Sequence, residues 1–180
     1  KKAAAYSRGL LSAGVVPIGK HFPGYGDLEG DSDHALVSTP WKKDRVLKEI
    51  SVFQQIHDVL GGVMLANVAY PAFNTRPAIL SPELVNLAHD NDWLAVTDDL
   101  SIPLLAEAIE GSPEDVLKQA LLAGNDLLLT TAPPDWDKGL DYVGILTALG
   151  ESDPEARRKI DAACRRVLRL KDRLGLLDDL

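Results

Sequence analysis

Cysteine is almost absent from this sequence: Cys164 is the only one among 180 residues. A single thiol cannot form an intramolecular disulfide, so a disulfide-stapled secreted scaffold is excluded. The lack of disulfides fits a reducing compartment, and we expect a cytoplasmic protein. No apolar stretch reaches the roughly 18 residues of a membrane span. No signal peptide is visible, although the chain starts with Lys1 rather than Met, so a targeting segment could precede it.

Basic charge is also scarce. Lys and Arg number 19 against 27 Asp and Glu, which gives a formal net charge of −8. Binding to a nucleic-acid backbone needs a basic footprint, so a nucleic-acid partner is not expected. The basic residues gather mainly in the last predicted helix, where a solvated helix face accounts for them. The hydrophobic fraction of 46% and the charged fraction of 26% are ordinary for one globular domain over residues 1–180.

Four apolar runs that end in polar residues alternate with amphipathic segments. The runs predict buried strands at residues 15–21, 63–70, 93–97 and 126–130. Helices are predicted at 3–13, 42–60, 81–90, 103–110, 112–123, 140–149 and 153–175. Two of the helix starts carry a strong signature, in which Ser81 and Ser112 act as N-caps and a proline follows each. Gly124 is expected to close the helix that begins at Ser112.

The order of these elements is a helix followed by four strand–helix units. Near-continuous apolar strands of this kind are typical of a parallel sheet covered on both faces. Four units are too few for a closed eight-stranded barrel, which takes about 250 residues. The chain is therefore either a compact open sheet or half of a (β/α)8 barrel. In both cases sheet edges are left open, so we expect a dimer mate, a second chain or residues before Lys1 to cover them.

The loop over residues 19–34 stands out chemically. It contains two His, one Lys and four carboxylates, and it offers the core very little. Loops held at strand ends by a rigid scaffold are where binding and catalytic groups concentrate. In (β/α) folds the active site lies at the carboxyl ends of the strands, and each predicted strand here ends in polar residues. We therefore expect this loop to form part of an active site.

The same loop also has some features of a calcium site. Asp27, Glu29, Asp31 and Asp33 alternate like the start of an EF-hand. The glycine, however, falls at the fourth position rather than the sixth, and the twelfth position is Ser38 rather than Glu. The sequence therefore predicts no metal site and no cofactor.

Four motifs, taken together, resemble a known family. They are the residues 20–24 with the Gly26–Asp27 that follows, 96–102, 123–128 and 160–171. In this order and spacing they resemble the family 3 glycoside hydrolases, in particular the bacterial β-N-acetylglucosaminidases. The resemblance implies a (β/α)8 catalytic barrel of the TIM type. Residues 1–180 would then be the C-terminal half of that domain and would supply about the last four β/α units.

The resemblance also implies an activity and its residues. A relative of this kind is a retaining hydrolase that removes terminal β-linked N-acetylglucosamine or a related β-hexose through a glycosyl-enzyme intermediate. By position in the family's motif, Asp98 is the nucleophile, and Asp99 is expected to orient or cap. Lys20 and His21 match the pair that binds sugar hydroxyls. Asn67 stands where the family often carries His, and its amide can also hydrogen-bond a hydroxyl.

The acid/base position departs from the family's pattern. In the relatives this loop contains Asp-Ser-His, whose His is the acid/base and whose Asp orients it, whereas here residues 31–34 read Asp-Ser-Asp-His. The loop could slip by one residue so that His34 serves, partnered by Asp31 or Asp33. Asp33 could itself serve if its surroundings raised its pKa. Alternatively the acid is lost, and the protein is a catalytically impaired homologue that binds carbohydrate or has a structural role. Tyr25, where the family commonly has His, is a second departure.

Overall fold

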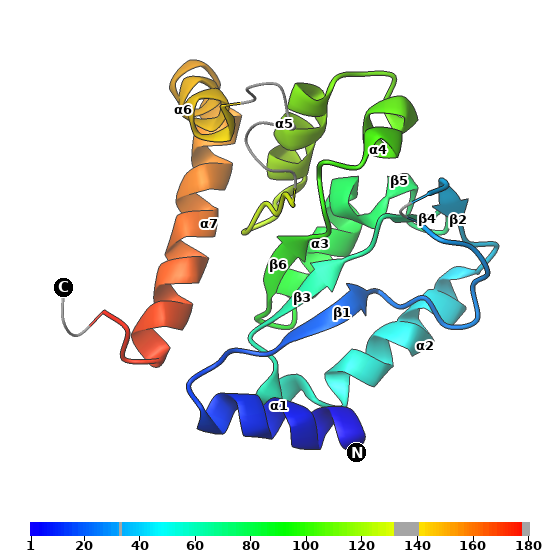
Figure 1. The fold of residues 1–180 in the computed structure, drawn as a ribbon, viewed down its shortest axis with the longest axis vertical. Helices are drawn as coiled ribbons and strands as arrows, with labels where there is room; N and C mark the ends of the chain where they lie inside the picture. The colour runs from blue at the N-terminus through cyan, green and yellow to red at the C-terminus, as the bar shows by residue number, and fades with distance from the viewer. Residues whose placement is uncertain (33, 132–140, 178–180) are drawn as a thin grey trace.

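The structure is a computed structural model, and it describes residues 1–32, 34–131 and 141–177 (Figure 1). Asp33, residues 132–140 and residues 178–180 lie outside the described part. The strands are β1 (Ile18–Phe22), β2 (Val37–Ser38), β3 (Gly62–Leu65), β4 (Val68–Tyr70), β5 (Asn74–Pro77) and β6 (Leu94–Thr97). The α-helices are α1 (Lys2–Ser12), α2 (Lys43–Gln54), α3 (Pro82–His89), α4 (Pro103–Ala108), α5 (Pro113–Ala123), α6 (Tyr142–Ser152) and α7 (Pro154–Arg173), with short 3₁₀ turns η1 (His57–Val59) and η2 (Ala78–Leu80).

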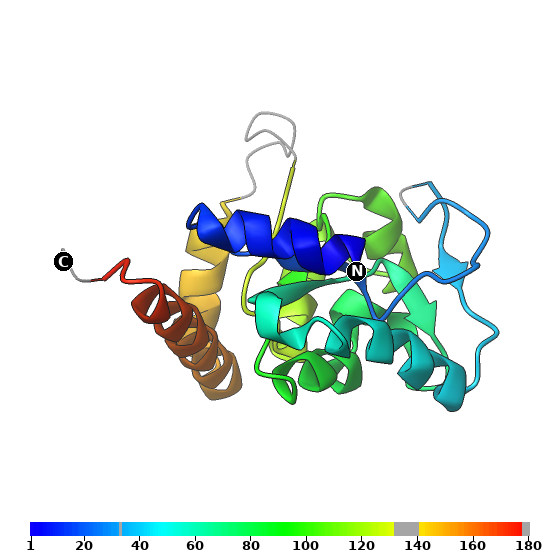
Figure 2. The ribbon, with the colours of Figure 1, turned by 90° about the horizontal axis from the view of Figure 1, so that it is seen from below.

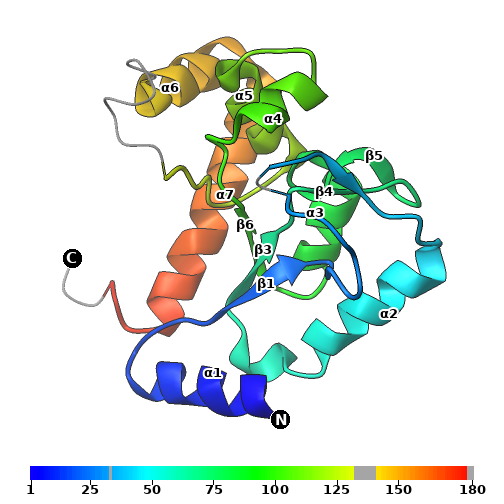
Figure 3. The same cartoon turned by 45° about the vertical axis from the view of Figure 1, so that its right-hand side comes forward.

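A parallel sheet in the order β1-β3-β6 forms the centre of the fold (Figure 1). Gly62 of β3 pairs with Ile18 of β1 and with Leu94 of β6, so the three strands begin in register. Helices pack beside the sheet, and α7 runs along the side nearest β6 (Figures 1 and 3). Because the strands are parallel, their carboxyl ends meet at one edge, which is where the polar residues of the motifs lie.

The fourth predicted strand, residues 126–130, is much shorter in the structure than the apolar run suggested. It joins the sheet through one parallel bridge between Val96 and Leu127. The Leu129 N–H then bonds to the Thr97 side-chain hydroxyl at 2.8 Å instead of continuing a main-chain ladder. The Leu100 N–H bonds to the Leu129 carbonyl at 2.9 Å, beyond the end of β6. The segment therefore bends over the end of β6, because a side chain takes the place of the next ladder partner.

The prediction of one strand over residues 63–70 was also wrong. The run breaks at Ala66 and Asn67, so that β3 belongs to the parallel sheet and β4 to a second sheet in the order β2-β4-β5. The Ala66 N–H still bonds to the Phe22 carbonyl at 2.9 Å, which continues the contact with β1. The second sheet lies beyond the carboxyl ends of β1 and β3 (Figure 3). The second sheet therefore lies next to the carboxyl edge of the parallel sheet, where the polar residues of the motifs are found.

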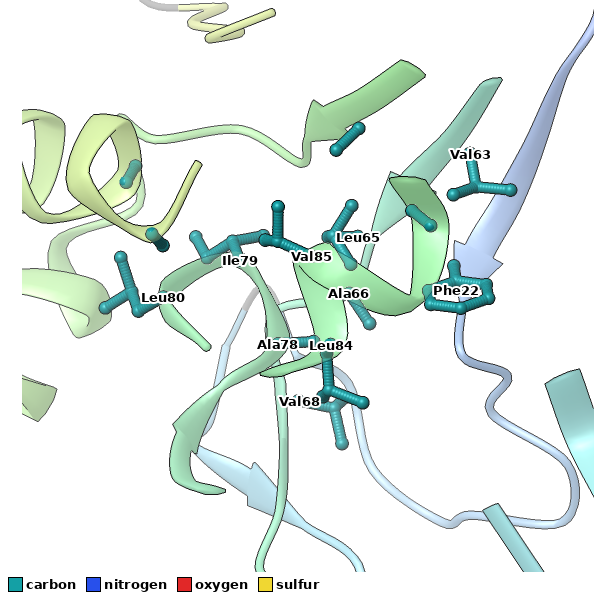
Figure 4. Close-up of a cluster of buried hydrophobic side chains, with 14 of the residues drawn as sticks. Phe22, Val63, Leu65, Ala66, Val68, Ala78, Ile79, Leu80, Leu84 and Val85 are labelled. Atoms are coloured by element: carbon teal, nitrogen blue, oxygen red, sulfur yellow. The ribbon is translucent and has the colours of Figure 1, made fainter. Parts of the chain in front are cut away.

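The hydrophobic core joins the parallel sheet to α2, α3 and α5, and Figure 4 shows the part of it around β3 and α3. Trp93 is 1% exposed and packs edge-on against Phe22, with ring centroids 6.2 Å apart. Burial of a large apolar side chain contributes about 1.5–3 kcal/mol, so this cluster anchors the ends of β1 and β3. The members labelled in Figure 4 are Phe22, Val63, Leu65, Ala66, Val68, Ala78, Ile79, Leu80, Leu84 and Val85.

Local signals at the helix ends were read correctly. The Ser81 hydroxyl accepts a hydrogen bond from the Leu84 N–H at 3.3 Å. At α5 a full capping box forms, in which the Ser112 hydroxyl accepts from the Asp115 N–H and the Asp115 carboxylate accepts from the Ser112 N–H. Among the helices that the structure describes, none combines the length and the apolar character needed to cross a bilayer.

Replacing Gly124 with alanine is expected to destabilise the protein by about 1–2 kcal/mol. Gly124 ends α5 with φ +107°, a left-handed conformation that side chains rarely adopt. An added Cβ would meet Val85 only at 3.4 Å, so the cost is backbone strain rather than a clash. Urea unfolding measures the effect. Gly9→Ala is the matched control, because Gly9 lies within α1 with open space around it and alanine should stabilise that helix. Equal effects of the two substitutions would contradict the explanation.

Candidate active site

His21 and Asp98 meet at the carboxyl edge of the parallel sheet. His21 lies in β1 and Asp98 directly follows β6, and their Nε2 and Oδ2 atoms are 3.6 Å apart. The two side chains are 28% and 16% exposed, so both are partly withdrawn from solvent. A cavity of about 390 Å³ opens beside them. It is lined by Lys20, His21, Tyr25, Gly30, Asp31, Ser32 and Asp98. The fold therefore brings together the Lys20–His21 motif and Asp98, which are the predicted site residues most distant in the sequence.

Tyr25 connects the loop to the sheet. Its hydroxyl and the Ser32 hydroxyl are 2.7 Å apart, and its ring meets the His21 ring edge-on with centroids at 5.3 Å. The loop's main chain is held as well, because the buried Tyr70 hydroxyl donates to the Gly24 carbonyl at 2.8 Å. Burial raises the pKa of Tyr70, and neighbouring Tyr25 and Glu49 add to this, so the hydroxyl stays protonated and remains a donor.

The start of the loop is fixed by close packing and charge. Gly26 has φ +51°, and a Cβ there would lie 2.7 Å from the Trp41 ring, so a larger residue does not fit. The Arg45 guanidinium lies over the same ring, 5.1 Å from its centroid. Arg45 also bonds to the carboxylates of Asp27 at 3.3 Å and Glu49 at 2.9 Å. These contacts hold the loop against α2, and the Trp41 ring also packs beside the ring of Tyr70 in the second sheet, with centroids 6.3 Å apart.

The predicted pairing of Asp31 with His34 is present. The His34 Nδ1 is 2.9 Å from Asp31 Oδ2, and the His34 N–H bonds to the Asp31 carbonyl at 3.1 Å. The loop therefore forms an Asp–His pair with the His one position later than in the family's motif. The His34 side chain is 82% exposed and is not among the cavity-lining residues, whereas Asp31 is. Asp33, the alternative acid, lies outside the described residues.

The neighbouring carboxylates Asp98 and Asp99 have different surroundings. Asp98 lines the cavity, and its Oδ1 accepts the Asp99 N–H at 2.9 Å. The Asp99 carboxylate instead accepts hydrogen bonds from the N–H and hydroxyl of Ser101 and from the N–H and hydroxyl of Thr131. Burial alone would raise the pKa of Asp99, but these bonds outweigh it and hold the pKa below its ordinary value. Asp99 thus ties the turn after β6 to the end of the 126–131 segment.

Replacing Asp99 with asparagine is expected to destabilise the protein by about 1–3 kcal/mol at pH 7. Because the pKa of Asp99 is lowered on folding, its ionised form contributes stability above the unfolded-state pKa near 3.8, and this is lost as the pH falls through the folded-state value. The difference between parent and variant should therefore shrink below about pH 4. Urea unfolding from pH 7 to pH 3 measures it, with Asp172→Asn on the exposed side of α7 as control. A difference that does not change with pH would contradict this role.

Asn67 lies behind the site. It is 2% exposed, and its Nδ2 donates to the Asp99 carbonyl at 3.5 Å. Its Oδ1 is buried without a hydrogen-bond partner in the described part of the chain. It does not line the cavity, so contact with a sugar stays a prediction. Tyr25, Gly30 and Ser32 do line it. The sequence marked Tyr25 only as a departure from a pattern.

Within residues 1–32, 34–131 and 141–177, no group of three or more His, Cys, Asp or Glu side chains is arranged to hold a metal ion. The chemistry that this edge of the sheet can perform is that of two carboxylates, a lysine and one imidazole beside an open cavity. These groups can bind hydroxyls, attack an electrophilic carbon and move a proton.

Fold and site together define an α/β chain of the TIM-barrel type with a carboxylate-containing site at the carboxyl ends of its strands. The family described as "Glycosyl hydrolase family 3 N terminal domain" matches residues 1–170. The chain belongs to glycoside hydrolase family 3, as the resemblance of its four motifs indicated.

Named relatives agree with this membership. The β-hexosaminidase LpqI of Mycobacterium tuberculosis is 32% identical over 179 residues, which cover 94% of this chain and 45% of the relative. The β-hexosaminidase of Methylococcus capsulatus is 30% identical over 172 residues, covering 91% of this chain and 49% of the relative. A solved family 3 β-N-acetylglucosaminidase from Paenibacillus superposes with a TM-score of 0.82 and 31% identity, over 96% of this chain and 34% of that one. The chain thus spans about half the length of these curated relatives or less.

Proposed function

We propose that this chain carries the catalytic residues, at the carboxyl ends of its parallel strands, of a retaining glycosidase that removes terminal β-linked N-acetylglucosamine or a related β-hexose. The observation that carries the proposal is Asp98, partly buried, 3.6 Å from His21 and lining one cavity with Lys20 and Asp31. Curated relatives at 30–32% identity are named β-hexosaminidases, which supports this substrate class.

Asp98 is the nucleophile in this proposal. Its carboxylate attacks the anomeric carbon and forms a glycosyl ester while the glycosidic C–O bond breaks. Lys20 and His21 stand on the same cavity wall and hydrogen-bond the sugar hydroxyls, which fixes the anomeric carbon in front of Asp98. Asp99 is not the nucleophile in this proposal, because its carboxylate oxygens are hydrogen-bonded to Ser101 and Thr131.

His34 supplies the proton for the leaving oxygen. Asp31 binds its Nδ1, so the orientation of the ring is fixed and Nε2 is directed away from the pair. In the second step the neutral His34 takes a proton from the attacking water, which breaks the ester to Asp98 and releases the sugar. The exposure of His34 requires that the loop close over the bound sugar, with Asp31 already at the cavity wall.

A partner surface is part of the proposal. Leu127 is 41% exposed and Leu129 is 36% exposed at the free side of the bridge with β6. An apolar groove of about 450 Å³ runs beside them between the 125–128 segment and α7. We propose that another polypeptide segment covers this edge and completes the barrel, supplied by residues before Lys1, a second chain or a dimer mate. Light scattering on a size-exclusion column tests this, and a monodisperse, fully soluble monomer of the isolated chain would count against it.

The experiment that tests the activity is turnover of 4-nitrophenyl N-acetyl-β-glucosaminide, with NMR identification of the anomer that is released first. Double displacement through Asp98 gives the β-anomer first, and release of the α-anomer would refute the mechanism.

The second candidate is a homologue that binds carbohydrate without efficient turnover. The observation in its favour is that the His34 side chain is 82% exposed and lies outside the cavity lining. Binding of N-acetylglucosamine by calorimetry without release of nitrophenolate would establish this alternative.

A further inference from the structure

A second, smaller cavity lies at the opposite end of the parallel sheet from Asp98. Gly61 and Leu94, at the amino ends of β3 and β6, form part of its wall, and α7 forms another part. Its volume is about 110 Å³. A water molecule in the liquid takes about 30 Å³, so the space suits a small ion rather than a sugar. The lining residues are Leu60, Gly61, His89, Asp92, Trp93, Leu94, Arg166, Arg169, Leu170 and Arg173.

Three arginines of α7 face this cavity together. Arg166, Arg169 and Arg173 are spaced by three and four positions, which places them on one side of the helix. The sequence suggested an ordinary solvated helix face for the basic residues of this segment. In the structure Arg169 and Arg173 are solvent-exposed, as expected of such a face, and all three arginines also line this cavity beside the amino ends of β3 and β6.

Arg166 is held by a buried carboxylate. Its Nε donates to Asp126 Oδ1 at 2.6 Å, and the Asp126 side chain is 0% exposed. The other oxygen of Asp126 accepts the Ala95 N–H at 2.9 Å and lies 3.0 Å from His89 Nε2. Both oxygens of Asp126 are therefore engaged, and they fix the guanidinium of Arg166 through its Nε; within the described residues no hydrogen bond is recorded for its terminal N–H groups.

The charge of the cavity wall is positive. Arg173 donates to Asp92 at 3.0 Å, and Asp92 is the one carboxylate among the lining residues. Arg169, between the two engaged arginines, makes no ion pair or hydrogen bond with the described part of the chain. The indole N–H of Trp93, another lining residue, is buried without a hydrogen-bond partner among the described residues. One guanidinium thus stays uncompensated in a protein whose formal charge is −8.

We propose that this cavity binds a phosphate group, either as the free ion or as the terminal group of a phosphate monoester. Guanidinium forks match the oxygens of phosphate in pairs, and Arg binds such groups with charge-assisted hydrogen bonds. Arg169 supplies the uncompensated charge, and Arg166 and Arg173 flank it along the helix. The proposal is independent of the glycosidase mechanism, since the cavity lies at the other end of the strands.

Thermal unfolding of the chain in inorganic phosphate, against sodium chloride at equal ionic strength and pH, tests this proposal. A bound ion raises Tm by an amount that grows with the logarithm of its concentration once this exceeds Kd, and we expect a rise of about 2–4 °C at about five times Kd. Arg169→Ala should abolish the rise. Arg165→Ala removes the same charge from an exposed position of the same helix outside the cavity, and should leave the rise intact. Broadening of the ³¹P signal of phosphate by the parent, and not by Arg169→Ala, gives a second readout that does not depend on stability.

A second arm with methyl phosphate distinguishes the two sources. A rise in Tm with both compounds assigns the site to the terminal phosphate of a monoester, and a rise with inorganic phosphate alone assigns it to the free ion. The proposal is refuted if phosphate stabilises the parent no more than chloride does, or if Arg169→Ala responds as strongly as the parent.

Discussion

Asp98→Asn is expected to lower kcat for 4-nitrophenyl N-acetyl-β-glucosaminide by about 10³- to 10⁶-fold. Asparagine has nearly the same shape, and its side-chain oxygen can still accept the Asp99 N–H that now bonds to Asp98 at 2.9 Å. The cavity should therefore keep its form and its affinity for N-acetylglucosamine, while the attacking carboxylate is gone. Steady-state kinetics, sugar binding by calorimetry and Tm together measure these three properties.

A second test of Asp98 as the nucleophile adds azide to the Asp98→Ala variant. The shortened side chain leaves room for azide to attack the anomeric carbon directly, in a single displacement, so the product should be the α-glycosyl azide. Asp172→Asn, a carboxylate change on the exposed side of α7, is the control and should leave kcat unchanged. An Asp98→Asn variant that keeps more than about a tenth of parental kcat would show that another group is the nucleophile.

His34→Ala is expected to slow cleavage of natural glycosides by about 10²- to 10⁴-fold and that of the nitrophenyl glycoside far less. The alkoxide of a sugar is a poor leaving group, so its departure needs the proton that His34 would donate. Nitrophenolate is a good leaving group and departs without that proton. Comparing the two substrates on one variant is its own control for misfolding.

The results with His34→Ala distinguish between the possible roles of the 31–34 loop. Equal losses on both substrates would show that His34 only supports the loop through its 2.9 Å contact with Asp31. No loss on either would exclude His34 as the acid. Asp33→Asn then tests the remaining carboxylate, and a parent that is inactive throughout while it binds sugar would favour the non-catalytic candidate.

Short-range signals in the sequence predicted local structure well. The serine caps at Ser81 and Ser112 and the left-handed Gly124 are all present, because each depends on contacts within about five residues. The strand boundaries were less predictable. Whether Ala66 and Asn67 continue a strand depends on pairing with β1 on one side and with the second sheet on the other. That information lies in distant parts of the chain.

The same division holds for the site. Motif position pointed to Lys20, His21 and Asp98, and the parallel register brings them to one cavity. Tyr25 and Ser32 were not predicted to line it, because their contact with each other at 2.7 Å depends on the path of the loop. The arginine-lined cavity was missed for a similar reason, since a helical repeat of Arg says nothing about the strand ends beneath it.

The strand order β1-β3-β6 also has a kinetic consequence. Lys20 and His21 lie on β1, and Asp98 follows β6, so the two walls of the candidate active-site cavity come together only through β3. Each parallel pairing requires a long crossover to close first, and such non-local contacts form slowly. A sugar that touches both walls can therefore recognise only chains in which both pairings exist. Its binding should slow unfolding and leave the refolding rate almost unchanged.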